Sequence, residues 1–245
     1  MRTVQKMLAG AMLMGAAISG VAHAEGTWSG NIALTTDYVF RGITQTSGNP
    51  AVQGGFDYVN GQFYAGTWAS NVSFSDGPEL DVYAGVTPSL GPVALNLGVV
   101  GYFYPGAQDD GAEFDYYEAK ATATITPATG FSVTGSLYYS PDFFGETGDA
   151  LYTEIAASYA ASDALSISGA FGHQTIDDVN GPGAGSVSGD YNTWNLGVTY
   201  TLSGFAIDAR YVDTDIDSGD DIATYAGTDE TAYDSAFILT VKKTL

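Results

Sequence analysis

The sequence predicts an all-β fold: a transmembrane antiparallel up-and-down β-barrel of about 12 strands that follows a cleaved signal peptide. Two observations on the chain after the leader carry this prediction. Apolar and polar residues alternate with a period of two in segments of about 9–13 residues. The connections between these segments alternate between tight turns and longer acidic stretches. Such segments are long for a soluble sheet and suit tilted strands that cross a membrane.

The composition excludes several classes of protein. The 245 residues include 28 acidic and only 7 basic side chains, which gives a formal net charge of −21. A chain without a cluster of basic residues lacks the positive surface that binds nucleic-acid phosphates. The absence of cysteine excludes disulfides and Cys-ligated metal sites. The aromatic content of 13% argues against disorder. We expect no cofactor, because no Gly-rich phosphate loop precedes a helical segment.

The first 24 residues have the organisation of a secretory signal peptide. Arg2 and Lys6 form a positive start, residues 7–21 are apolar and small, and Ala22-His23-Ala24 is a cleavage signature. The alternative, a membrane anchor, is disfavoured because the apolar run is short for a spanning helix. Loss of Arg2 and Lys6 would change the formal net charge from −21 to about −23. The expected organisation is a signal peptide at 1–24 and a barrel at 25–245.

The expected strands follow one another with turn signals between them. The first runs from Thr27 to Arg41, with apolar or small residues at its even positions. Neighbouring strands joined by short turns are the rule in antiparallel barrels. The other strands are expected at 49–59, 62–71, 79–90, 92–104, 114–126, 131–140, 150–161, 165–175, 190–202, 205–213 and 231–245.

The connections predict which end of the barrel is which. Tight turns fall at 59–62, 88–92, 126–130, 161–164 and 202–204. The other connections are longer and acidic, and they fall at 41–50, 70–79, 105–113, 140–149, 176–190 and 213–232. Outer-membrane barrels have short periplasmic turns and longer extracellular loops. We therefore expect the tight turns on the periplasmic side and localisation in the outer membrane of a Gram-negative cell.

One face of each strand is suited to contact lipid. In the segment 92–104 the apolar face carries Val93, Leu95, Leu97 and Val99. Aromatic residues gather near strand ends, as expected for two girdles at the membrane interfaces. The last segment has apolar residues at every second position, Phe237, Leu239 and Val241. A terminal strand of this kind is what barrel assembly machinery recognises. The expected partners are therefore outer-membrane lipid, lipopolysaccharide and that machinery, and no nucleic acid.

One stretch near the start of the barrel is similar to a known family. "LTTDYVFRGITQTSGNPAVQGGFDY", residues 34–58, contains "DYVFRG" followed by a short connection and "AVQGGFDY". This stretch resembles the start of the TorF-type porin family of proteobacterial outer membranes. The resemblance implies an outer-membrane β-barrel that conducts small solutes.

Arg41 stands out in so acidic a chain. It shares with Asp37 the face of the first segment opposite Leu34 and Phe40, so it is expected to point into the lumen. An arginine on the lipid face would cost about 2–4 kcal/mol at the bilayer midplane. Two interpretations stay open: an ion pair with Asp37 or an acid of a neighbouring strand, or a constriction charge that sorts ions.

Further charged residues have the parity of the lumen. Lys120 lies on one face with Glu118, and Arg210 lies on one face with Asp208. Charges of both signs can narrow a pore or leave a barrel filled by side chains, and twelve strands lie between the small filled barrels and the wide porins. The candidates for the lumen or its constriction are Asp37, Arg41, Asp57, Asp81, Glu118, Lys120, Glu154, Asp208 and Arg210.

Acidic residues are dense in the longest connection, 213–232. Alternating carboxylates can hold Ca²⁺, but the order of an EF-hand loop is missing. Solvated surface charge is the simpler interpretation, and divalent cations bridging the loop to lipopolysaccharide are another. An acidic mouth concentrates cations. The weak calcium candidates are Asp213, Asp215, Asp217, Asp220 and Asp221.

The favoured function is an outer-membrane porin-like channel for passive diffusion of small hydrophilic solutes, with a preference for cations. The alternative is a narrow or closed barrel with a structural, adhesive or specific-uptake role. A barrel lipid hydrolase that uses His173, the one histidine outside the leader, is less favoured. Its expected place on the lipid-facing rim would suit a lipase, but Gly-x-Ser-x-Gly is absent and no nearby strand offers a nucleophile motif. We therefore expect no enzyme activity.

Overall fold

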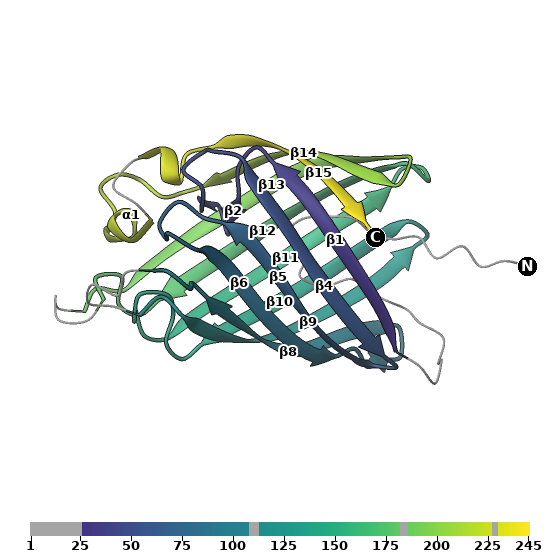
Figure 1. The fold of residues 1–245 in the computed structure, drawn as a ribbon, viewed down its shortest axis with the longest axis horizontal. Helices are drawn as coiled ribbons and strands as arrows, with labels where there is room; N and C mark the ends of the chain where they lie inside the picture. Colours follow the sequence, from purple (N-terminus) through teal and green to yellow (C-terminus); the bar gives the residue numbers. More distant parts are fainter. Residues whose placement is uncertain (1–25, 108–112, 182–185, 227–229) are drawn as a thin grey trace, which may run out of the picture.

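The fold is a closed antiparallel β-barrel of twelve strands (Figure 1). The computed structural model describes residues 26–107, 113–181, 186–226 and 230–245. The predicted signal peptide lies outside the described residues. Each strand pairs with its neighbour along the chain, β1 pairs with β15, and β6 pairs with β8, so the described sheet closes on itself.

Apart from the first and the last, the barrel strands agree closely with the predicted segments; the last begins at Ala236 and not at 231, because a 3₁₀ turn, Glu230–Ala232, comes before it. A short strand, β7 (Ser89–Leu90), extends the wall beside β8, and two others, β2 (Val39–Phe40) and β3 (Ile43–Thr44), form a separate pair. The barrel strands are β1 (Thr27–Thr35), β4 (Ala51–Asn60), β5 (Phe63–Asn71), β6 (Pro78–Val86), β8 (Val93–Phe103), β9 (Tyr116–Ala128), β10 (Phe131–Ser140), β11 (Ala150–Ala160), β12 (Leu165–Ile176), β13 (Gly189–Leu202), β14 (Phe205–Thr214) and β15 (Ala236–Thr244).

The predicted difference between the two ends of the barrel is confirmed. Tight turns, several with a glycine at positive φ such as Gly61 and Gly130, gather at one end, which we call the turn end. Glycine adopts these backbone angles without steric cost. Longer connections occupy the opposite end, which we call the outer end, together with the helix α1 (Asp221–Ala226) and the 3₁₀ turn η1 (Glu230–Ala232) (Figure 1).

Outward and inward faces differ as the alternation predicts. On β6, Leu80 and Val82 are exposed on the outside, whereas Asp81 between them is fully buried inside. On β8, Leu97 and Val99 are exposed and Val100 is buried. An exposed apolar outer band is the surface that a barrel presents to lipid. In the part of the chain that the structure describes, no helix is long and apolar enough to cross a membrane.

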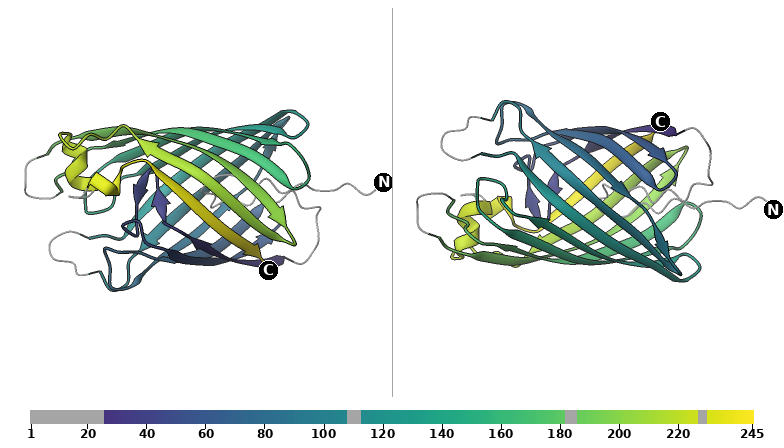
Figure 2. Two further views of the ribbon diagram at one scale, coloured as in Figure 1. Left: turned by 90° about the horizontal axis from the view of Figure 1, so that it is seen from above. Right: turned by 90° about the horizontal axis from the view of Figure 1, so that it is seen from below.

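The first predicted strand is wrong in its second half. β1 ends at Thr35, and residues 36–50, which we call the inward hairpin, turn back inside the barrel, where the two short purple strands lie (Figure 2). Arg41 and Gly42 make the two-residue turn between β2 and β3 with φ values of 49° and 88°. Positive φ at both central residues is the type I′ geometry that matches the twist of a hairpin. Asp37 and Arg41 therefore sit on this hairpin and not on the barrel wall.

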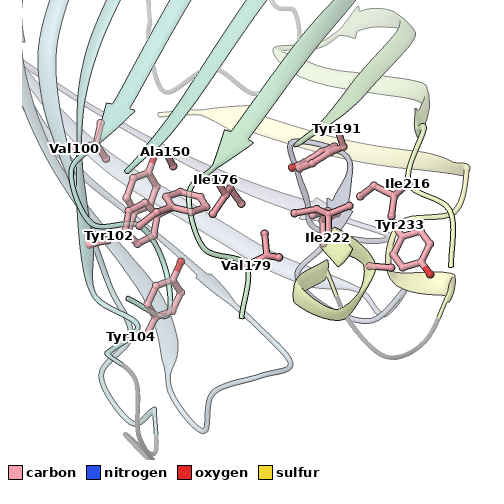
Figure 3. Packing of buried hydrophobic residues seen from close by; sticks show 14 of the residues in the cluster. Val100, Tyr102, Tyr104, Ala150, Ile176, Val179, Tyr191, Ile216, Ile222 and Tyr233 are labelled. Carbon is pink, nitrogen blue, oxygen red and sulfur yellow. The ribbon is translucent and has the colours of Figure 1, made fainter. Parts of the chain in front are cut away.

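The buried apolar residues gather in the outer half of the barrel. The rings of Tyr102 and Tyr116 are stacked, with centroids 4.4 Å apart. Ile222 of α1 lies beside Tyr191 and Ile216 in the same cluster (Figure 3). The helix was not expected from the acidic segment 213–232, and its Ile222 helps to close the cluster from the outer end.

Candidate functional site inside the barrel

From the tip of the inward hairpin, Arg41 contacts two strands on one side of the wall, β9 and β12. Its Nη2 donates to Glu118 Oε2 of β9 at 2.7 Å, and its Nη1 donates to Gln174 Oε1 of β12 at 2.8 Å. All three side chains are buried. A guanidinium held by two oxygen acceptors has a fixed orientation, which a lysine ammonium would not reproduce.

Aromatic rings enclose the same guanidinium. Its central carbon lies 4.4 Å from the ring centroid of Tyr152 and 5.2 Å from that of Tyr138. Ring faces attract cations, and the attraction grows when both groups are removed from water. Burial opposes the charge of Arg41, but the Glu118 carboxylate favours it, and the pKa of Arg41 is raised overall. We call Glu118, Gln174, Tyr138 and Tyr152 the cation box.

The hairpin is braced by its own polar groups. Asp37 Oδ1 accepts hydrogen bonds from the hydroxyls of Thr44 and Thr46, at 2.5 and 2.7 Å. The Thr46 hydroxyl in turn accepts from the backbone N–H of Tyr38. A Cβ added to Gly42 would lie 2.3 Å from Thr214 Cγ2, so the hairpin tip packs against the wall and needs glycine there. Asp37 is therefore a positioning residue of the hairpin and not the ion-pair partner of Arg41.

Two acids of β6 lie inside the barrel near the hairpin. Glu79 accepts a hydrogen bond of 2.7 Å from the Tyr38 hydroxyl. Burial, with the carboxylates of Glu79 and Asp81, raises the pKa of Tyr38 well above its ordinary value, so the phenol keeps its proton for this bond. Both carboxylate oxygens of Asp81 are buried without a hydrogen-bond partner among the described residues. Buried polar groups are usually paired, so this one needs an explanation.

Toward the turn end the interior is polar and more accessible. Arg210 binds Asp208, Asn195 Oδ1 at 2.6 Å and Ser168 Oγ at 3.0 Å. Asp57 accepts a hydrogen bond of 2.7 Å from Tyr83. Two further lumen candidates also have partners inside the barrel. Glu154 accepts a hydrogen bond of 2.9 Å from the Tyr152 hydroxyl, and the Lys120 ammonium lies 5.4 Å from the centroid of the Tyr64 ring.

Exposure of the inward side chains locates the narrowest part of the interior. At the level of the hairpin, Asp81 is 0% exposed and Glu118 is 1% exposed. Closer to the turn end, Asp57, Asn96 and Thr122 are partly exposed although they also point inward. The hairpin and the aromatic cluster therefore constrict the outer half, whereas some polar groups nearer the turn end are partly exposed.

The structure brings together only some of the predicted site residues. Arg41 joins Glu118, and Arg210 joins Asp208, whereas Arg41 and Asp37 have separate partners. Sequence reasoning missed Gln174, Tyr152 and Glu79. Glu79 shares the lumen parity of Asp81, which was an available signal, while Gln174 and Tyr152 become relevant only once the hairpin is known to fold inward.

The acidic residues of 213–221 bind neighbouring backbone and side chains. Asp215 accepts hydrogen bonds from the backbone N–H and the side-chain amide of Asn192, both at 2.6 Å. Asp213 accepts from the Tyr211 hydroxyl, and Asp220 accepts from the backbone N–H of Asp217. Asp221 begins helix α1. Within the described ranges, no three acidic or histidine side chains are grouped so that they could hold a metal ion.

His173 lies on the outside of β12, as its parity predicts. Its neighbour Gln174 points inward to Arg41, and Phe171 on the same face as His173 is half exposed. The Nδ1 atom of His173 is 3.0 Å from Asn192 Oδ1. This contact orients the imidazole, but it supplies no nucleophile.

Comparison with known proteins places this geometry in a family. Residues 20–245 match the model of a family described as "Bacterial protein of unknown function (Gcw_chp)". The chain belongs to this family. The match covers every strand of the Gcw_chp barrel described above. It does not confirm the predicted TorF-type resemblance, which rested on the opening 25-residue stretch rather than on the whole chain.

Two solved structures that are similar to the Gcw_chp barrel are described as porins. A structure described as "KdgM porin" aligns with a TM-score of 0.55 and 8% identity, over 88% of this chain and 98% of that one. A second, "KdgM porin in complex with disordered oligogalacturonate", aligns with a TM-score of 0.52 and 8% identity, over 89% and 98%. At this identity the likeness shows the fold alone. A search of curated proteins returned no match to the chain.

Proposed function

We propose that this Gcw_chp protein is an outer-membrane channel for small hydrophilic solutes, and that the inward hairpin forms its constriction. The observation that carries the proposal is the closed twelve-strand barrel with an apolar exterior and a charged interior, crossed near its outer end by Arg41. The fold shared with the KdgM porin supports it. So does the expected signal peptide, which would direct the chain out of the cytoplasm.

A preference for cations follows from the interior charges. Among the described inward side chains, acids outnumber bases, and the acidic connections at the outer end add to the negative potential. Acidic linings concentrate cations and repel anions. The acids inside are Asp37, Asp57, Glu79, Asp81, Glu118, Glu154 and Asp208, against Arg41, Lys120, Arg210 and Lys242.

The partners proposed with this function are those of an outer-membrane barrel. Lipid and lipopolysaccharide would contact the exposed apolar band, and the barrel assembly machinery would insert the chain. Extraction of the protein from purified outer membranes, with heat-modifiable migration in electrophoresis, checks both localisation and barrel folding. Recovery from the inner membrane or the cytoplasm would argue against the assignment.

The direct test of channel function is conductance in a planar bilayer with a KCl gradient. The proposal predicts discrete current steps and a reversal potential on the cation-selective side. A folded barrel that produces no steps, either alone or after the hairpin is loosened, would contradict channel function.

A second candidate is a closed barrel with a structural, adhesive or specific-uptake role. The filled outer half favours it, because Tyr102, Tyr116 and Ile176 are each at most 3% exposed inside the wall. The two candidates differ in whether loosening the hairpin opens a conducting path. In a channel it does, whereas in a barrel that is filled for structural reasons it lowers stability without producing current.

A further inference from the structure

We propose that the outer half of the lumen is a binding site for organic cations, meaning small solutes with a guanidinium or primary ammonium group. The Arg41 side chain occupies the cation box in the free protein, and a bound solute displaces this side chain from the box. The inference rests on the proposed channel function and deepens it by naming the solute class. Three features of the structure support it.

The first feature is that the box belongs to the wall and not to the hairpin. Glu118 lies on β9, Tyr138 on β10, Tyr152 on β11 and Gln174 on β12, so one guanidinium is held by four barrel strands. Movement of the hairpin would remove Arg41 and leave the acceptors and rings in place. A carboxylate, an amide oxygen and two ring faces are the groups that recognise a planar organic cation.

The second feature is the backbone at the occupant itself. Arg41 has a φ of 49°, in the left-handed region that side chains other than Gly, Asn and Asp seldom adopt. Non-glycine residues persist in such conformations only when their surroundings fix them, and they cluster at ligand clamps and switches. Here the surroundings are the type I′ turn of the hairpin together with the contacts of Arg41 with the box. A solute that replaces these contacts would release the turn from its constraint.

The third feature is a carboxylate beyond the one that Arg41 neutralises. Glu118 has Arg41 and the Tyr102 hydroxyl, and Glu79 has the Tyr38 hydroxyl, but Asp81 has no hydrogen-bond partner among the described residues although it is fully buried. Its cross-strand neighbours are the aromatic residues Trp68 and Tyr102. A buried carboxylate beside aromatic residues is a second position for positive charge.

These features favour solutes with two positive groups over metal ions. One group would take the place of the Arg41 guanidinium, and the other would meet Asp81. The described residues offer no cluster of three acidic or histidine ligands for a metal. An alkyl chain with a guanidinium at one end and an ammonium at the other carries both positive groups, and agmatine is the simplest probe of this kind.

The first test is block of single-channel current by agmatine, with the full-length gene expressed and the protein purified from membranes. The matched control solute is N-carbamoylputrescine, in which a neutral urea replaces the guanidinium. We expect agmatine to block wild-type channels at least ten-fold more strongly than the control solute, and Glu118→Gln to remove most of this difference. The matched control variant is Lys243→Gln, because Lys243 lies near the turn end and donates to Ser203 O, away from the box.

The second test needs no current and so separates this inference from the channel proposal. Arg41→Ala empties the box of its guanidinium, and the thermal midpoint of the detergent-solubilised protein is measured with millimolar methylguanidinium or with neutral methylurea. We expect methylguanidinium alone to raise the midpoint of the variant, and to have no such effect on Arg41→Ala/Glu118→Gln. Arg41→Met, which also leaves the box without a cation, serves if Arg41→Ala does not fold.

The outcomes distinguish the two proposals. Current steps without selective agmatine block, or equal effects of methylguanidinium and methylurea, would overturn the cation site while leaving the channel in place. Selective stabilisation by methylguanidinium in a protein that never conducts would overturn the channel and support the cation site.

Discussion

Arg41 and Glu118 are 77 residues apart in sequence, and their side chains meet at 2.7 Å inside the barrel. The contact joins the tip of the inward hairpin to the opposite strand β9 and fixes the hairpin across the lumen. Both partners are buried, so the pair is little screened by solvent.

Removal of Arg41 should destabilise the barrel. Arg41→Met leaves the buried Glu118 carboxylate with the Tyr102 hydroxyl as its one hydrogen-bond donor among the described residues, and breaking a buried ion pair in this way costs about 3–5 kcal/mol. Arg41→Glu should cost more, because it adds a second negative charge beside Glu118. The measurement is the free energy of unfolding by urea in detergent micelles or lipid bilayers. A loss no larger than that of Lys243→Gln would show that the pair does not hold the hairpin.

Loss of Asp37 should loosen the hairpin while Arg41 remains. Asp37→Ala removes the acceptor for Thr44 and Thr46, about 1 kcal/mol for each hydrogen bond. We expect larger or longer single-channel openings than in wild type, because the hairpin spends more time away from the wall. Asp190→Ala is the control, since this exposed aspartate lies on the outer face of β13. Equal conductance in both variants would argue that the hairpin does not limit current.

Arg210 should influence ion selectivity. It lies inside the barrel with Asp208 and Asn195, so Arg210→Gln leaves the Asp208 carboxylate unbalanced beside the solute path. The reversal potential in a KCl gradient should move further toward cation selectivity. Lys243→Gln removes the same charge outside the lumen and should leave the potential unchanged. An unchanged potential in Arg210→Gln would place this residue in a wall-stabilising pair only.

His173 should be dispensable for any effect of the protein on lipids. Its contact with Asn192 orients the ring on the outer face but brings no nucleophile to it. We expect no release of fatty acid from phospholipid vesicles by the wild-type protein, and unchanged heat-modifiability in His173→Ala. Hydrolysis that disappears in His173→Ala would establish the lipase alternative.

Most of the wall could be predicted from sequence because the alternation of apolar and polar residues indicates directly which side chains face lipid. Parity places Leu97, Val99 and Phe237 on the outward face, and all three are exposed. The difference between tight turns and longer connections was sufficient to predict the two ends of the barrel. These features are local, so they can be read one segment at a time.

The site could not be predicted in the same way because it depends on contacts across the barrel. Alternation continues through Tyr38 and Phe40 although the chain has already left the wall, so parity alone placed Arg41 on β1. The one local signal was Gly42 after Arg41, which permits a turn with positive φ. The partners Glu118 and Gln174 lie on strands that no sequence rule brings to Arg41.

The most direct test of the account compares single-channel conductance in the wild type and Arg41→Ala, each in a bilayer with a KCl gradient. If the hairpin constricts a solute path, the wild type conducts in small cation-selective steps, and Arg41→Ala conducts in clearly larger ones. If neither protein conducts while both migrate as folded, heat-modifiable barrels, the interior is filled for structural reasons and the channel proposal is wrong.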